Sequence, residues 1–147
     1  MSFEKRELPI PSVSDAYVTN WDKDKEIRFL LNEDGEYTLN ASEFYSAFNW
    51  LFSIEFRELI EAINRRENAI ANALEYEEAM FVAAKNGTPL TDQQIYDALA
   101  AERDLGFHKG ICHEKREQII EQCGWGVYID VVHLYETFTG TPREWVA

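Results

Sequence analysis

The chain carries pairs of carboxylates at a spacing that suits metal chemistry. Glu55, Glu58 and Glu61 follow one another at intervals of three, and Glu75 and Glu78 repeat that interval. Residues three apart share one face of a helix, and carboxylate oxygens are ligands that Mg²⁺ prefers. Two such pairs on packed helices would hold a Mg²⁺ ion, so a magnesium site is one hypothesis for these residues.

This pattern resembles the paired acidic helices of all-α nucleoside-triphosphate pyrophosphatases, over one helical hairpin at most. The resemblance implies a Mg²⁺-dependent nucleotide pyrophosphohydrolase that uses the helical glutamates. The sequence offers no glycine-rich phosphate loop, and the nearest bases are Arg65, Arg66 and Lys85. Glutamate is also a good helix former that belongs on solvated faces. The enzyme is therefore an alternative, and a solvated helix face is the simpler interpretation.

A second set of residues has the chemistry of a zinc site. His108 and Cys112 are four apart, as are His113 and Glu117, so each pair can present two ligands on one helix face. Zinc takes four protein ligands, or three and a water, and no further cysteine or histidine lies at a spacing that completes the set. We expect no metal, and we keep these four residues only as weak candidates.

Other catalytic patterns are missing from the sequence. Asp130 stands three residues before His133, which matches one half of a helical di-iron site, but no second half exists. The chain has no Gly-x-Ser-x-Gly elbow, no phosphate-binding glycine loop and no dinucleotide fingerprint. We therefore expect a protein that is not an enzyme, with no catalytic residue and no cofactor, Mg²⁺ being the alternative.

Acidity is the strongest feature of the composition. The 147 residues include 27 acids and 14 bases, for a net charge of −13. Residues 1–40, 41–86 and 87–147 carry −4, −4 and −5, so the charge belongs to the whole surface and to no tail. Such a surface repels nucleic acid and anionic membranes and favours basic partners. We expect no direct nucleic-acid binding and no membrane contact.

The aromatic residues suggest where a partner would bind. Nine Phe, seven Tyr and four Trp are too many for a disordered chain. Tyr45 and Trp50 fall on the flank of an apolar helical stripe, and Trp21 and Trp125 fall in predicted loops. Tyrosine and tryptophan outside a core stripe are typical of protein-binding patches, although they also cap the ends of helix bundles.

The elements that must position these residues begin with a β-hairpin. The composition of residues 1–20 predicts an extended arm with a short strand at 17–19. Asp34-Gly35 lies between the β-prone runs 25–31 and 36–39, which is a hairpin signal. A lone hairpin is marginal in water, so this one must pack on helices or join a three-stranded sheet.

Helix boundaries are the clearest local signals. Asn40 with Glu43, and Thr91 with Gln94, are capping boxes that start helices. Between residues 41 and 86 there is no Gly or Pro, and a polar stretch at 64–68 leaves open one helix or two. Two apolar stripes run through it, one of Phe44, Phe48, Leu51, Phe52, Phe56, Leu59, Ile60 and Ile63, the other of Ile70, Ala73, Leu74, Phe81 and Ala84.

The C-terminal part predicts three more helices. Two helices are expected at 92–105 and about 107–123, because Gly106 and Gly110 weaken the case for one continuous helix. A third is expected at 127–139, although the alternation of apolar residues there also fits a strand. The whole chain, 1–147, is then a single helix-dominated α+β domain. A small N-terminal β-hairpin or three-stranded sheet (1–40) packs on a bundle of four to five helices (41–147).

The function that these features favour is binding. We expect an acidic inhibitor or adaptor that occupies a basic surface of a partner macromolecule, with a character similar to phage anti-defence and toxin-immunity proteins. In a nucleic-acid mimic, Glu55, Glu58, Glu75 and Glu78 would stand in for phosphates. A further alternative is a structural or regulatory protein that associates with itself as a homodimer. The N-terminus lacks an apolar leader and only two cysteines are present, so we expect a cytoplasmic protein.

Overall fold

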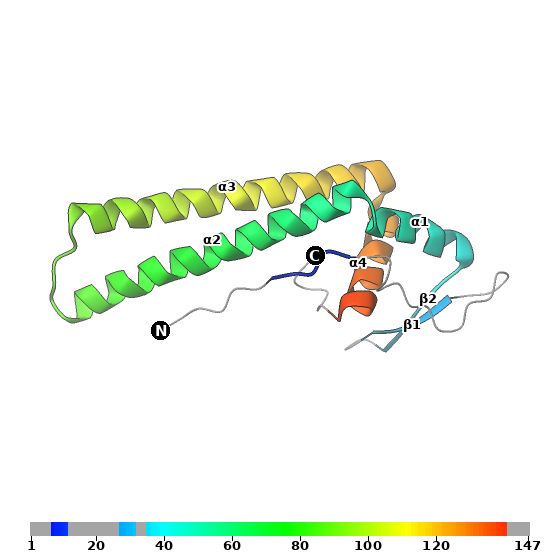
Figure 1. Ribbon diagram of the computed structural model, residues 1–147, viewed down its shortest axis with the longest axis horizontal. Coiled ribbons are helices and arrows are strands. Elements are labelled where there is room, and N and C mark those ends of the chain that lie inside the picture. Colours follow the sequence, from blue (N-terminus) through cyan, green and yellow to red (C-terminus); the bar gives the residue numbers. More distant parts are fainter. Residues whose placement is uncertain (1–6, 12–26, 32–34, 141–147) are drawn as a thin grey trace. The chain divides into compact units, whose positions relative to one another are not determined.

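The fold is dominated by helices, as predicted. The computed structural model describes residues 7–11, 27–31 and 35–140 (Figure 1). Two strands and four helices follow one another there: β1 (Ile27–Leu31), β2 (Gly35–Leu39), α1 (Ala41–Leu51), α2 (Ile54–Lys85), α3 (Asp92–Cys123) and α4 (Trp125–Thr139). The residues that were ambiguous between helix and strand, 127–139, are helical.

The two strands pair only with each other. They are antiparallel, with Ile27 opposite Leu39 and Leu31 opposite Gly35. No third strand occurs within 7–11, 27–31 or 35–140, so the three-stranded sheet is not supported. The strand predicted at 17–19 and the turn residues 32–34 lie outside the described residues.

Both predicted capping boxes are confirmed. The Asn40 side chain accepts a hydrogen bond from the Glu43 backbone at 2.8 Å, and the Glu43 carboxylate accepts one from the Asn40 backbone at 3.1 Å. Thr91 and Gln94 exchange the equivalent pair at 3.1 and 2.9 Å. These bonds satisfy amide groups that a helix start leaves without partners.

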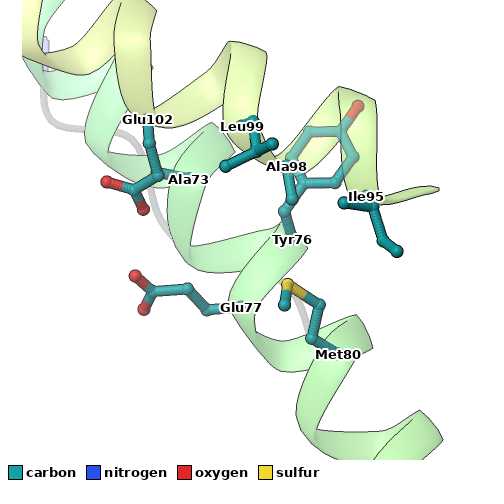
Figure 2. Close-up of a pocket in the computed structure, with 8 residues that line it drawn as sticks. All are labelled: Ala73, Tyr76, Glu77, Met80, Ile95, Ala98, Leu99 and Glu102. Carbon is teal, nitrogen blue, oxygen red and sulfur yellow. The ribbon is translucent and has the colours of Figure 1, made fainter. Parts of the chain in front are cut away.

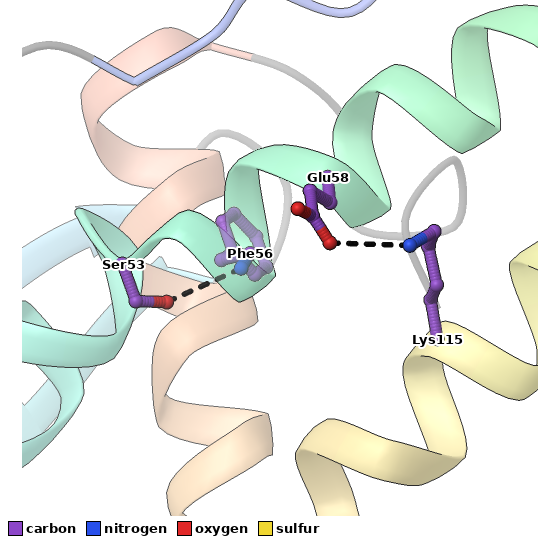
Figure 3. A network of polar contacts seen from close by, with 4 residues as sticks. All are labelled: Ser53, Phe56, Glu58 and Lys115. Carbon is purple, nitrogen blue, oxygen red and sulfur yellow. Dashed lines mark hydrogen bonds and ion pairs between the residues drawn. The ribbon is translucent and has the colours of Figure 1, made fainter.

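Residues 41–86 form two helices, but they break at 52–53 and not in the polar stretch 64–68. The Ser53 hydroxyl lies at the break, where it donates to the Trp50 carbonyl at 2.6 Å. It also accepts from the Phe56 amide at 3.2 Å, as Figure 3 shows. The serine therefore closes α1 and caps α2 at once. The polar residues 64–68 simply continue α2.

The prediction of two helices between residues 92 and 123 is wrong. α3 runs from Asp92 to Cys123 without interruption, through Gly106 and Gly110. A glycine lowers helix stability by only about 1 kcal/mol, which neighbouring turns offset in a helix of this length. The predicted stops at Gly87, Gly124 and Gly140 are confirmed, since each has a positive φ, of 68°, 87° and 73°.

The two glycines inside α3 give a first testable prediction. A Cβ added at Gly106 or Gly110 would meet no atom within 4 Å. Gly106→Ala and Gly110→Ala are each expected to raise the free energy of unfolding by about 0.5–1 kcal/mol, because alanine loses less backbone entropy. Chemical denaturation measures the change. Gly87→Ala is the matched control, and its left-handed φ should make it destabilising by about 1 kcal/mol.

The chain divides into two compact units, and α2 and α3 contribute to both. Unit 1 comprises Met1–Glu7 and Ala62–Glu114, and unit 2 comprises Leu8–Glu61 and Lys115–Ala147. The single domain over 1–147 stays a prediction. In unit 2, α1 contacts α4 and β2, and α4 also contacts β1.

Unit 2 has a core of large side chains. Phe56 is fully buried, with its ring edge-on to Tyr135 at a centroid distance of 5.6 Å. The Tyr135 hydroxyl donates to the Pro9 carbonyl at 2.7 Å, which ties the segment 7–11 to α4. On the surface of this unit, Lys115 pairs with Glu58 at 3.2 Å (Figure 3).

Candidate functional site: an open apolar face in unit 1

Unit 1 reverses the usual pattern of burial. Its fully buried residues are mostly small, among them Ala62, Ala69, Ala73, Ala98 and Ala101. Eight of its large apolar side chains are exposed, whereas Ile63 is the one that is fully buried among its described residues; the exposed ones are Leu74, Met80, Phe81, Val82, Ile95, Tyr96, Leu99 and Phe107. These are eight of the eleven large apolar side chains that are exposed among the described residues. Unit 1 therefore leaves uncovered the residues that ordinarily form a core.

The spacing of residues along α2 explains this reversal. One side of it follows a coiled-coil rhythm of alternating four- and three-residue steps through Ala62, Arg66, Ala69, Ala73, Tyr76 and Met80, along which the alanines are buried and Met80 is exposed. A second stripe of the same rhythm runs one residue later and includes Ile70, Leu74 and Phe81. α3 has its own small-residue row through Ala98, Ala101 and Cys112. The alanines of these rows and Cys112 are buried. The side chains of the second stripe become more exposed along α2, from the half-buried Ile70 to the exposed Leu74 and Phe81.

A groove lies between α2 and α3 beside this second stripe. Its volume is about 270 Å³. Figure 2 shows the eight residues that line it, which are Ala73, Tyr76, Glu77, Met80, Ile95, Ala98, Leu99 and Glu102. We call the groove together with Leu74 and Phe81 the open face. Phe81 and Leu99 are the most exposed apolar members of it, at 69% and 61%.

The predicted aromatic anchors lie elsewhere. Tyr45 and Trp125 are exposed and Trp50 is half-buried, all in unit 2. Trp125 lies against the ring of Tyr128, with centroids 6.0 Å apart. Trp21 lies outside the described residues. Tyr45, Trp50 and Trp125 are not among the residues that line the groove.

The predicted carboxylates all lie on α2. Glu55 and Glu58 belong to unit 2, whereas Glu75 and Glu78 belong to unit 1. The magnesium hypothesis needs carboxylates from separate helices that face one another. One helix carries all of them, and Glu58 is engaged with Lys115. The arrangement expected of a pyrophosphohydrolase is therefore not formed by these residues.

The zinc candidates do not converge. His108 pairs with Asp104 at 3.4 Å, Cys112 is buried, and His113 and Glu117 are exposed along α3. Within the described part of the chain, no three His, Cys, Asp or Glu side chains gather in a group that could hold a metal ion. The two cysteines are both free thiols. Burial raises the pKa of the Cys123 thiol, which also donates to the Gly124 carbonyl.

α4 carries a buried polar row, of which the sequence pattern singled out Asp130 and His133 but not Glu136. Asp130, His133 and Glu136 recur at intervals of three and are 8%, 6% and 2% exposed. Their neighbours Val131, Leu134 and Tyr135 are buried as well, so almost the whole circumference of α4 is covered. The row belongs to the interior of unit 2 and forms no metal group among the described residues.

Tyr128, also on α4, offers a second prediction. Its hydroxyl is buried and has no hydrogen-bond partner among the described residues, whereas that of Tyr135 donates to Pro9. Tyr128→Phe is expected to leave the free energy of unfolding unchanged or raise it by up to about 1 kcal/mol, because the desolvated hydroxyl is removed. Tyr135→Phe should lower it by about 1 kcal/mol. Urea titration of both variants at pH 7 measures these free energies of unfolding. Equal changes in the two variants would contradict the difference in hydrogen bonding between the two hydroxyls.

Alkaline pH should separate the same variants further. Burial raises the pKa of Tyr128 to about 12, and the nearby Arg116 guanidinium partly offsets this rise. An unfolded tyrosine ionises near pH 10, so the wild type should lose stability as pH rises above about 10. Tyr128→Phe should lack that part of the loss, which denaturation at pH 7 and 10.5 would reveal.

The open face is the site that sequence patterns missed. The sequence predicted an apolar stripe that contains Leu74 and Phe81 but gave it no binding role, and it gave none to Leu99 or Glu102. The signal that could have found it is the presence of two heptad stripes on one helix, since a single partner helix covers only one.

Comparison with known protein families, with curated proteins and with solved structures finds no match. In the described residues, no helix is both long and apolar enough to cross a membrane. The assignment of function therefore depends on the residues of the open face and on the charge of the chain.

Proposed function

We propose that this chain is a non-enzymatic binding protein that docks a basic partner macromolecule through the open face of unit 1. The observation that supports it is the reversed burial, with alanines inside and large apolar side chains outside. Burying one such side chain contributes about 1.5–3 kcal/mol, so a partner that covers several of them would gain substantial free energy. Solvent-exposed apolar clusters of this kind are typical of protein interaction sites.

The net charge of −13 supports a basic partner. Long-range attraction would steer the encounter, and apolar contacts would then hold the complex. An inhibitor or adaptor, including one that mimics nucleic acid as anti-defence and toxin-immunity proteins do, is the specific form that we propose. Tyr45, Trp50 and Trp125 remain proposed contacts of a secondary kind, because they lie in unit 2.

Affinity capture from the native host, at low and at high salt, tests the proposal. We expect a basic protein to be retained at low salt and reduced at high salt, because screening weakens charge steering and pairing. Ile54→Ser is a matched control, since Ile54 is exposed, apolar and in unit 2. It should retain the partner.

Two results would contradict the proposal. One is capture that persists after the open face is made polar. The other is the lack of any partner together with a rise in melting temperature on adding Mg²⁺, which would favour the pyrophosphohydrolase alternative.

A further inference from the structure

The size of the groove between α2 and α3 limits what it can hold. At about 270 Å³ it falls below the roughly 300–1,000 Å³ typical of pockets for drug-sized ligands. Its floor and walls are largely apolar, from Ala73, Met80, Ala98 and Leu99. A space of this size and polarity suits one or two apolar side chains of a larger molecule.

The apolar surface continues beyond the groove along the helices. Leu74 and Phe81 are seven residues apart on α2, so they lie on one side of it at a separation of two turns. Ile95 and Leu99 are one turn apart on α3. A strip with this spacing matches the face of an amphipathic helix, whose anchors recur at intervals of three, four and seven.

Two carboxylates set the charge that the occupant must carry. Glu77 from α2 and Glu102 from α3 are both exposed, and Figure 2 shows their carboxylates on the same side of the groove. No Lys or Arg lines the groove. A second copy of this chain would bring two more carboxylates to the interface, where like charges oppose association. A helix with Lys or Arg beside its apolar anchor would instead pair with them.

We infer that the open face binds an amphipathic helix with a leucine-type anchor in the groove and flanking Lys or Arg side chains against Glu77 and Glu102. The inference rests on the proposed function and specifies the partner surface. It places the apolar anchor over Ala73 and Ala98, and it lays the remaining apolar face along Leu74 and Phe81.

Three synthetic peptides test the inference with the full chain. Each has about 18 residues, long enough for a helix to form on binding. The first carries leucines at intervals of three and four with lysines on the flanks, the second replaces the leucines by glutamine, and the third replaces the lysines by glutamate. Titration calorimetry is expected to show that the first peptide binds at least about tenfold more tightly than either of the others.

Variants of the chain locate the binding. Leu99→Ser, and the double change Glu77→Gln with Glu102→Gln, should each weaken binding of the first peptide by about tenfold. The matched control is Glu114→Gln with Glu121→Gln, which removes the same charge from exposed sites outside the groove and should change affinity less than twofold. All of these side chains are exposed, so circular dichroism should show unchanged helix content.

The outcomes are distinct. Equal binding of the leucine and glutamine peptides, or equal weakening by both charge-removing variants, would overturn the inference while leaving salt-dependent capture, and hence the proposed function, intact. Sedimentation that shows a dimer of this chain, weakened by Leu99→Ser, would also overturn it, because the occupant would be a second copy. Capture that ignores the open face would remove the proposed function itself.

Discussion

Phe56→Ala is expected to lower the free energy of unfolding of unit 2 by about 3–5 kcal/mol, a large share of the roughly 5–15 kcal/mol typical of native proteins. Phe56 has no exposed surface and lies edge-on to Tyr135, whose hydroxyl holds the Pro9 carbonyl. Truncation leaves a cavity at the point where α2, α4 and the segment 7–11 meet. The measurement is urea denaturation followed by tyrosine and tryptophan fluorescence.

Phe81→Ala is the matched control for this prediction. It removes the same atoms from the same helix, but Phe81 is 69% exposed. The expected loss is below about 0.5 kcal/mol, because exposed side chains far from the core contribute little. Similar losses for the two variants would show that the burial pattern described for α2 is wrong.

The second large effect concerns binding. Phe81→Ser combined with Leu99→Ser is expected to weaken the interaction with the captured basic partner by at least about 100-fold, because central apolar anchors dominate interface energetics. The melting temperature should stay within about 2 °C of the wild type, since both side chains are exposed. Interferometry with the purified partner, beside differential scanning calorimetry, measures the two quantities.

Ile54→Ser provides the comparison for the binding prediction. Ile54 is 72% exposed, but it lies in unit 2 and outside the open face. Its replacement should leave affinity unchanged. A partner that binds the double variant and the wild type equally well would place the interface elsewhere, with Tyr45 and Trp125 the next residues to test.

Local signals predicted the ends of helices well. Asn40, Thr91, Gly87 and Gly140 act through hydrogen bonds or backbone angles within a few residues, so their effect can be inferred without the rest of the fold. The break at Ser53 was missed although serine is a good cap, because the apolar stripe continues across it from Phe48 through Phe56. A regular stripe does not reveal a change of helix direction.

Tertiary context decided the remaining differences. Glycine weakens a helix only slightly, so its two positions in α3 could not predict whether the neighbouring turns would hold the helix together. A stripe such as Leu74 and Phe81 predicts that one face of a helix is apolar, but not that the same chain covers it. The candidate site was missed for that reason, whereas the core around Phe56 and Leu59 followed the predicted stripe.

The alanine-rich interior of unit 1 also has a consequence for amide hydrogen exchange. Small buried side chains resist separation weakly, so the outer turns of α2 and α3, from Ala73 to Lys85 and from Asp92 to Glu102, should exchange through local opening well below the free energy of global unfolding. The amides around Phe56 and Leu134 should exchange only when unit 2 unfolds. An occupant of the open face would slow amide exchange in these turns first. Slower exchange there would therefore show that a partner is bound.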